Sequence, residues 1–192
     1  QSENQEFLSG ALLIGIALII LLLVFQFNSI SKPFIVLASI VLSFTGVFMG
    51  IIIFNLTFSI LMTMLGIISL TGIIVNNAVV LIDYTQLLFD RKKIDLNMSK
   101  DEIIDKMTAM ELVKTAGKAR LKPVLLTAIT TIFGLIPLAV GLNIDFFSLF
   151  ANWNPNVYLG GDNVVFWGPL AWTVIFGITF ACLLYTSDAA DD

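Results

Sequence analysis

Two adjacent asparagines, Asn76 and Asn77, stand in the middle of a long apolar run and are the side chains most suited to chemistry in this sequence. Ser69, Gly72, Asn76 and Asp83 are spaced by three, four and seven residues, so they share one face of a helix. Lipid offers no hydrogen-bond partners, and polar side chains within a membrane therefore usually face other helices or a wet path. We predict a functional role for the two asparagines. Ser69 and Asp83 would support them, although Asp83 is near enough to the end of the run to reach the membrane interface.

Two other apolar runs carry similar small or polar stripes. One contains Thr127, Thr130, Thr131 and Gly134, and the other contains Ser39, Ser43, Gly46 and Gly50. Small residues let helix backbones approach, and hydroxyl groups can bond across the contact. We assign Gly46, Gly50, Gly72 and Gly134 to helix packing, and packing alone is the alternative interpretation for every Ser and Thr in these stripes. We also expect the Ser69, Gly72 and Asn76 face to pack against the face of Thr127, Thr131 and Gly134.

The residue types that are missing exclude several classes of function. The sequence contains no His and a single Cys, Cys182, and its carboxylates form no cluster with metal-ligand spacing. No nucleophile–base pair and no phosphate-binding Gly loop is present, so we expect neither enzyme activity nor a cofactor. Nine of the ten Lys and Arg lie between Arg91 and Lys122, but six acids are interspersed from Asp90 to Glu111, which disfavours nucleic-acid binding.

The elements that must position these residues are membrane helices. Hydrophobic residues make up 58% of the 192 residues and charged residues 12%, against about 25% in soluble domains. Because about 20 apolar residues cross a hydrocarbon core, we predict an all-α polytopic transmembrane helix bundle with five spans, the last of them truncated. The spans are expected at about 7–27, 34–54, 58–84, 123–142 and 164–181. Residues 1–6 would end an outward-facing region, and 85–122 would form a cytoplasmic segment.

The basic residues predict the orientation of these spans. All ten fall in the turn after the first span or in the segment after the third, and two-span spacing puts both on one side. Excess Lys and Arg marks the cytoplasm, so the amino terminus, the Asn55 link and the segment 142–163 are expected outside. Within the cytoplasmic segment, residues 99–102 resemble a capping box. A short amphipathic helix containing Ile103, Met107 and Met110 is expected to follow on the membrane surface, with a solvated linker helix as the alternative.

Three stretches resemble membrane helices of the resistance–nodulation–cell division (RND) superfamily. They are the turn from Phe25 to Ser29 with Pro33, the run from Gly66 to Tyr84, and the run from Arg120 to Leu138. The second is similar to the tenth helix of these transporters and the third to the eleventh. The resemblance covers about residues 7–181 in matching order, and it implies helices eight to twelve of a multidrug- and amphiphile-exporting permease.

The resemblance also implies a proton relay. In the family, two Asp on the fourth helix act with a Lys on the tenth and a Thr on the eleventh. The Thr corresponds to Thr127, the Lys position holds Asn76, and Asn77 matches the Asn that follows; the Asp pair would lie upstream of this chain. An asparagine can donate a hydrogen bond but supplies no positive charge, so the relay would depart from that of the better-known pumps.

Further expectations follow from the same resemblance. Protons would be the coupling ion, the location would be the bacterial inner membrane, and the pump would be a homotrimer joined to a periplasmic adaptor and an outer-membrane channel. Two alternatives remain: a protein-export accessory or lipid-handling protein of the same superfamily, and a purely structural membrane anchor. Residues 182–192 resemble translated adapter sequence from a sequencing library rather than a native helix end, and they are excluded from the expected fold. The missing initiating Met and signal peptide suit an excerpt of a longer protein.

The predicted topology can be tested by labelling. In the complete transporter, cysteines replacing Lys100 and Asn154 should react with a membrane-impermeant maleimide from opposite sides of the membrane. The reason is the one-sided distribution of Lys and Arg. Labelling of both positions from the outside would contradict the orientation.

Overall fold

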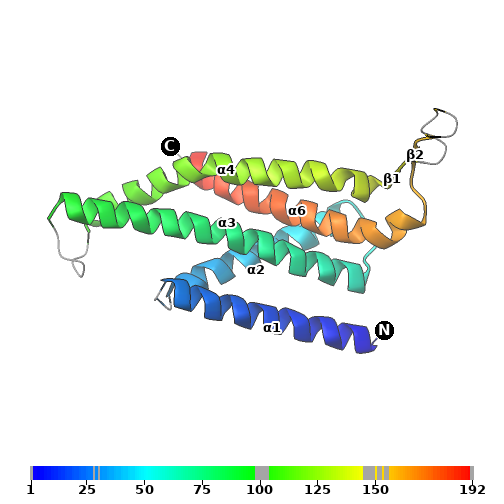
Figure 1. Cartoon of the computed structure of the whole chain (residues 1–192), viewed down its shortest axis with the longest axis horizontal. Helices are drawn as coiled ribbons and strands as arrows, with labels where there is room; N and C mark the ends of the chain where they lie inside the picture. Colours follow the sequence, from blue (N-terminus) through cyan, green and yellow to red (C-terminus); the bar gives the residue numbers. More distant parts are fainter. Residues whose placement is uncertain are drawn as a thin grey trace.

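The computed structural model describes residues 2–27, 29, 31–97, 104–144, 150, 153 and 156–190, and side chains within 3–183 of these ranges. Its elements are α1 (Ser2–Phe27), α2 (Ser31–Ile53), α3 (Ile60–Asp95), α4 (Lys106–Val140), β1 (Leu142–Asn143), β2 (Tyr158–Leu159) and α6 (Asp162–Ala190). Each of the five helices is long and apolar enough to cross a membrane. The predicted all-α multi-pass bundle is therefore confirmed, with its helices lying side by side along one direction (Figure 1).

Two helices run well beyond the spans expected from the sequence. α3 has 36 residues and α4 has 35, which is over 50 Å of helix at ~1.5 Å per residue, against a hydrocarbon core of ~30 Å. Neither Gly nor Pro occurs between Tyr84 and Asp95, so nothing stops α3 from continuing after its apolar residues end. Most of the segment predicted as 85–122 is thus an extension of the two membrane helices.

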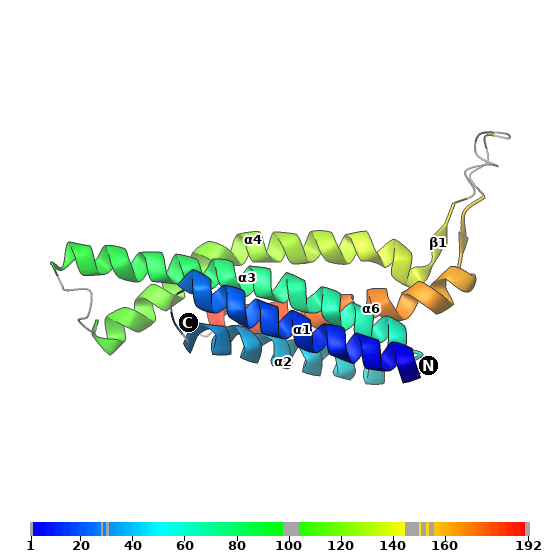
Figure 2. The ribbon, with the colours of Figure 1, turned by 60° about the horizontal axis from the view of Figure 1, so that its bottom comes forward.

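The separate surface helix expected in this segment is not what the structure shows. Met107 and Met110 belong to the first turns of α4, which is continuous with the fourth span. The helix begins after Asp105, whose side chain accepts a hydrogen bond from the Met107 backbone N–H at 3.2 Å. The capping box predicted at 99–102 and Ile103 of the predicted surface helix lie outside the described residues. Figure 2 shows the first turns of α4 at an angle to the rest of the helix. α4 contains Pro123 and Pro137, and a proline inside a helix lacks the N–H that would bond the carbonyl four residues earlier, which is a common cause of such a bend.

α6 is the central helix of the bundle. It packs against α4, α3 and α2, and half of its membrane span is buried, compared with 11% for α1 at the periphery. Small residues allow this close packing: a Cβ on Gly46 would overlap the Phe180 side chain, and a Cβ on Gly50 would overlap Phe176. Gly177 of α6 lies equally close to Leu70 of α3.

A short antiparallel β-ribbon joins α4 to α6 beyond the end of the bundle (Figure 1), in place of an irregular loop. Leu142 pairs with Leu159, and the Asn143 amide donates to the carbonyls of Gly141 at 3.0 Å and Gly160 at 2.6 Å. Gly141 ends α4 in the left-handed conformation (φ 67°), where a side chain would be strained and would overlap Val164. The sequence showed no strand periodicity here, because each strand has only two residues.

The backbone of α6 continues to Ala190, beyond the expected end near Ala181. Leu183 is the last residue whose side chain is described. The adapter origin of residues 182–192 stays a prediction.

The contact between α2 and α6 gives a stability prediction. Gly46→Ala and Gly50→Ala should each destabilise the membrane domain by about 1–3 kcal/mol, because the added methyl group overlaps a phenylalanine in a filled interface. The measurement is the thermal unfolding midpoint in detergent. Gly15→Ala in α1, where no atom lies within 4 Å of the new Cβ, is the matched control and should leave the midpoint unchanged. Equal effects at all three positions would contradict the packing.

Candidate functional site

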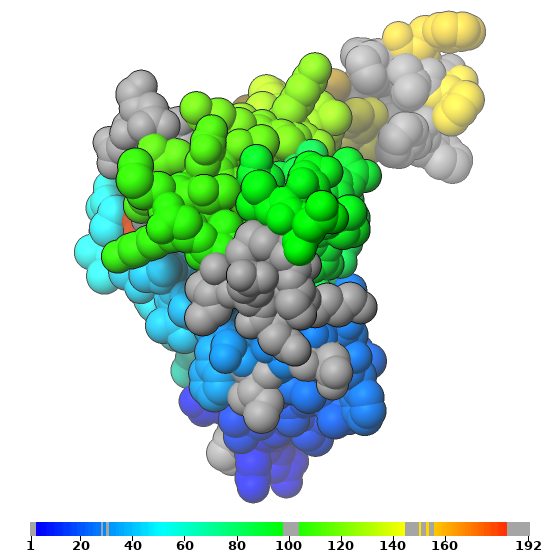
Figure 3. Space-filling model, turned by 90° about the vertical axis from the view of Figure 1, so that its left-hand side faces the viewer, coloured from blue at the N-terminus to red at the C-terminus, as the bar shows by residue number. Residues whose placement is uncertain are grey.

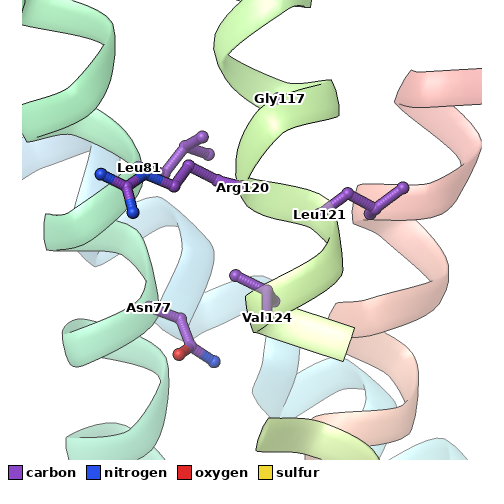
Figure 4. A pocket seen from close by; sticks show the side chains of 6 residues that line it. All are labelled: Asn77, Leu81, Gly117, Arg120, Leu121 and Val124. Atoms are coloured by element: carbon purple, nitrogen blue, oxygen red, sulfur yellow. The ribbon is translucent and has the colours of Figure 1, made fainter. Parts of the chain in front are cut away.

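α3 and α4 meet around a small pocket in the half of the bundle nearer the C-terminal end of α3 and the N-terminal end of α4. It is lined by Asn77 and Leu81 of α3 and by Gly117, Arg120, Leu121 and Val124 of α4 (Figure 4). Its volume is about 40 Å³, which is enough for a water molecule if polar partners are available. Figure 4 shows the Arg120 side chain reaching from α4 towards α3 near Leu81, with Asn77 further along α3. The pocket therefore joins one of the predicted asparagines to a cation.

Arg120 was not among the residues singled out from the sequence. Its guanidinium lies over the ring of Tyr84, 4.3 Å from the ring centroid, and its buried Nε has no hydrogen-bond partner in the described part of the chain. The signal was available: Arg120 lies seven residues, or about two turns, before Thr127 and thus on nearly the same face of α4. Arg120 was overlooked because it lies between Lys118 and Lys122, in a segment rich in lysine. The stacked ring holds a positive charge at the α3–α4 contact.

The two predicted polar faces do not pack against each other, so that expectation is wrong. Ser69, Gly72, Asn76 and Asp83 are all exposed on α3. On α4, Thr127, Thr130 and Gly134 are exposed and Thr131 is half-buried. Gly72 and Gly134 have no atom within 4 Å of an added Cβ, unlike Gly46 and Gly50. The helices approach each other through the pocket residues instead. Asn77 directly follows Asn76 on α3, and Val124 lies about one turn before Thr127 on α4.

Both polar faces nevertheless lie on the same side of the helix pair. Each residue turns about 100° around the helix axis. Asn76 is therefore rotated by about 100° from Asn77, and Thr127 by about 60° from Val124, each against the winding direction of its own helix. Because α3 and α4 run in opposite directions (Figure 1), these two rotations lead to the same side. The residues that pack on α6, such as Leu70 and Ala128, turn away from it. Asn76, Asp83, Thr127 and Thr130 thus form one exposed surface, which we call the polar face.

The hydroxyl groups of the polar face are satisfied within their own helix. Thr127 Oγ1 donates to the Val124 carbonyl at 2.9 Å, and Thr131 Oγ1 donates to the Thr127 carbonyl at 2.7 Å. Thr130 Oγ1 lies within hydrogen-bond distance of the same Thr127 carbonyl, at 3.0 Å. The side-chain amides of Asn76 and Asn77, by contrast, make no hydrogen bond within the described residues. The amides are therefore the groups of this surface that still need partners.

These features can be compared with known proteins. The sequence model of the AcrB/AcrD/AcrF family matches residues 1–143, which is most of the chain and includes both asparagines, Arg120 and Thr127. The chain belongs to the AcrB/AcrD/AcrF family. This confirms the resemblance to RND permeases, and together with the five apolar helices it identifies a multi-pass membrane protein.

Individual proteins of similar sequence can also be compared with this chain. The chain is 34% identical over 174 residues to the swarming motility protein SwrC of Bacillus subtilis, covering 91% of the chain. It is 25% identical over 182 residues to the multidrug resistance protein MdtC of Erwinia tasmaniensis, covering 95%. The chain spans about one-seventh of the length of these relatives, 14% and 15% respectively. No solved structure matches at a comparable level of significance.

The α3–α4 contact can be tested by cross-linking. In a background carrying Cys182→Ser, the pair Asn77→Cys and Val124→Cys should be joined by a short bismaleimide, because both residues line the same pocket. The control pair Gly72→Cys and Thr130→Cys, from the exposed surface, should give far less product. Mobility on a gel, after cleavage at a protease site engineered between residues 97 and 104, measures the yield. Preferential cross-linking of the control pair would support the packing expected from the sequence instead.

Proposed function

We propose that this chain is the carboxy-terminal membrane part of a proton-driven efflux pump and that its polar face carries part of the proton pathway. The observation that supports this most is the pair of unsatisfied amides at Asn76 and Asn77 on the membrane helix α3, with Asn77 lining the same pocket as Arg120. An unsatisfied polar group is costly in hydrocarbon. We therefore expect other helices to pack on the polar face and to provide hydrogen-bond partners for the amides.

The chemistry of the face favours carboxylates as those groups. Asn76 and Asn77 can donate N–H bonds, Thr127 can accept or donate through its hydroxyl, and Arg120 adds a positive charge. Donors stabilise the ionised form of a carboxylate, while burial raises its pKa. A carboxylate held between these effects can take up and release a proton during each transport cycle. This agrees with the resemblance to RND pumps, in which an Asp pair on another helix completes the relay.

In this proposal Asn76 replaces the lysine of the better-known pumps, and no ammonium is available to compensate the ionised carboxylate. The remaining cation on these helices near the polar face is Arg120, two turns before Thr127 on α4. Asp83, exposed about two turns from Asn76 on the same stripe, lies toward the cytoplasmic extension of α3. It would mark the inner exit of the path, with Ser69, Thr130 and Thr131 lining it.

The proposed activity and partners of the whole pump are inferred from similar proteins. MdtC is named a multidrug resistance protein and SwrC a swarming motility protein, so export of drugs or amphiphiles is the activity we propose. A trimer in the bacterial inner membrane, with a periplasmic adaptor and an outer-membrane channel, is part of the same proposal. A protein-export or lipid-handling role would use the same relay. A structural anchor is disfavoured, because an anchor has no need for paired amides without partners.

Mutation of the relay tests the proposal. In the complete transporter, Asn76→Ala and Thr127→Ala should reduce proton-coupled export while leaving expression and assembly intact. A hydrogen bond of this kind inside a membrane contributes about 0.6–2 kcal/mol, or roughly 0.5–1.5 pKa units of a neighbouring carboxylate. The pH dependence of export in proteoliposomes should shift accordingly. Asn76→Leu should be worse than Asn76→Ala, because it also excludes any water that could replace the amide.

Thr45→Ala provides the matched control. Thr45 is an exposed threonine of α2 that donates to the Val41 carbonyl, as Thr127 donates to Val124, and its loss should leave export unchanged. If Asn76→Ala and Thr127→Ala both exported substrate at the unmodified rate across the working pH range, these side chains would serve only packing. The proposal would then be rejected.

A further inference from the structure

A second surface of the membrane helices carries a regular charge pattern that the relay does not use. Lys114, Lys118 and Lys122 follow one another at intervals of four residues on α4, and all three side chains are exposed. They lie on one face of the helix. Glu111 is the single acidic residue between Lys106 and Val140, against four lysines and one arginine. α4 therefore carries a strong positive charge on the part that leaves the bundle.

An exposed apolar stripe continues this face into the membrane. Leu126, Ile129 and Phe133 are 63%, 48% and 68% exposed. Counted at about 100° per residue, they lie within about a sixth of a turn of Lys122. The polar face is centred on another side of α4, because Thr127 lies about 100° or more from all three of these residues. Thr130, about 40° from Leu126, lies at the border between the two faces. The lysines and the apolar stripe thus form one continuous surface, which we call the lysine–apolar face.

The dimensions of this face match one leaflet of a bilayer. Counting about 20 residues back from the end of α4 at Val140 places Lys122 at the cytoplasmic edge of the hydrocarbon core. From Lys122 to Phe133 the helix rises about 16 Å, close to half of a ~30 Å core. Lys118 lies one turn further out, in the headgroup layer. An acyl chain can follow the apolar residues while its headgroup meets the two lysines.

Figure 3 shows the end of the molecule that bears these lysines. The last turns of α3 and the first turns of α4 lie together on this end, with long side chains projecting from the surface. Basic residues that follow a membrane span attract anionic lipid headgroups, by roughly 1 kcal/mol per residue, or about fivefold in affinity. Zwitterionic headgroups gain far less, because they have no net charge.

We propose that the lysine–apolar face of α4 is a binding site for an anionic phospholipid of the cytoplasmic leaflet. The headgroup phosphate contacts Lys118 and Lys122, and one acyl chain lies along Leu126, Ile129 and Phe133. Lys114 lies a further turn into the cytoplasm and adds to the attraction without reaching the phosphate. The site is independent of the proton relay, so either proposal can fail without the other.

Native mass spectrometry of the complete transporter tests the site. The detergent-purified protein is titrated with phosphatidylglycerol or with phosphatidylcholine of the same acyl chains, and bound lipids are counted. We expect phosphatidylglycerol to bind more tightly at one site per chain, and Lys118→Gln with Lys122→Gln to weaken that binding about tenfold or more. Lys118→Arg with Lys122→Arg keeps both charges and should retain it. Retention in the arginine variant also shows that loss in the glutamine variant is not due to misfolding.

Arg91→Gln with Lys106→Gln is the matched control. It removes two charges from the same cytoplasmic end, but Lys106 lies about 24 Å along α4 from Lys122, and Arg91 is on α3. This variant should bind phosphatidylglycerol like the unmodified protein. Equal loss in both double variants would show a diffuse charge effect and overturn the site. Equal binding of the two lipids by the unmodified protein would also overturn the site. The same result is expected if another part of the transporter covers this face.

Discussion

Hydrocarbon offers no hydrogen bonds, and this constraint governs the arrangement of polar groups on α3 and α4. The threonines meet it locally, by donating to carbonyls three or four residues earlier in their own helix. The amides of Asn76 and Asn77, by contrast, have no partner in the described part of the chain. Polar groups in a membrane usually face other helices or a wet path. In our proposal, this exposed surface of the chain is therefore an interior surface of the complete transporter.

The packing of α6 explains why this surface stays open. Gly46, Gly50 and Gly177 let α6 press closely against α2 and α3, and α6 takes up the sides of α3 and α4 that carry Leu70 and Ala128. The opposite side of the α3–α4 pair holds the polar face. Small residues in the two places thus differ: those of α2 and α6 lie in a closed interface, whereas Gly72 and Gly134 have no atom within 4 Å of an added Cβ. We propose that another helix covers that surface.

Much of this could be predicted from the sequence, because the length of apolar runs fixes the number of spans and helical spacing fixes which residues share a face. Asn76, Gly72 and Ser69 do share one. Which faces meet could not be predicted, since Asn77, next to Asn76, and Val124, one turn before Thr127, make the contact instead. Arg120 was missed because its stacking on Tyr84 depends on the relative position of two helices. The ends of α3 and α4 were misplaced, because helix continues after hydrophobicity stops.

The central claim is that the polar face is covered by a carboxylate-bearing helix. The most direct test is the distance from the Asn76 side-chain nitrogen to the nearest carboxylate oxygen in an experimental structure of the complete transporter. The account predicts a carboxylate from another helix within hydrogen-bond distance, about 2.7–3.2 Å, or bridged by one water, with Thr127 beside it. Asn76 and Thr127 surrounded by lipid tails, with no carboxylate on the facing helices, would contradict it.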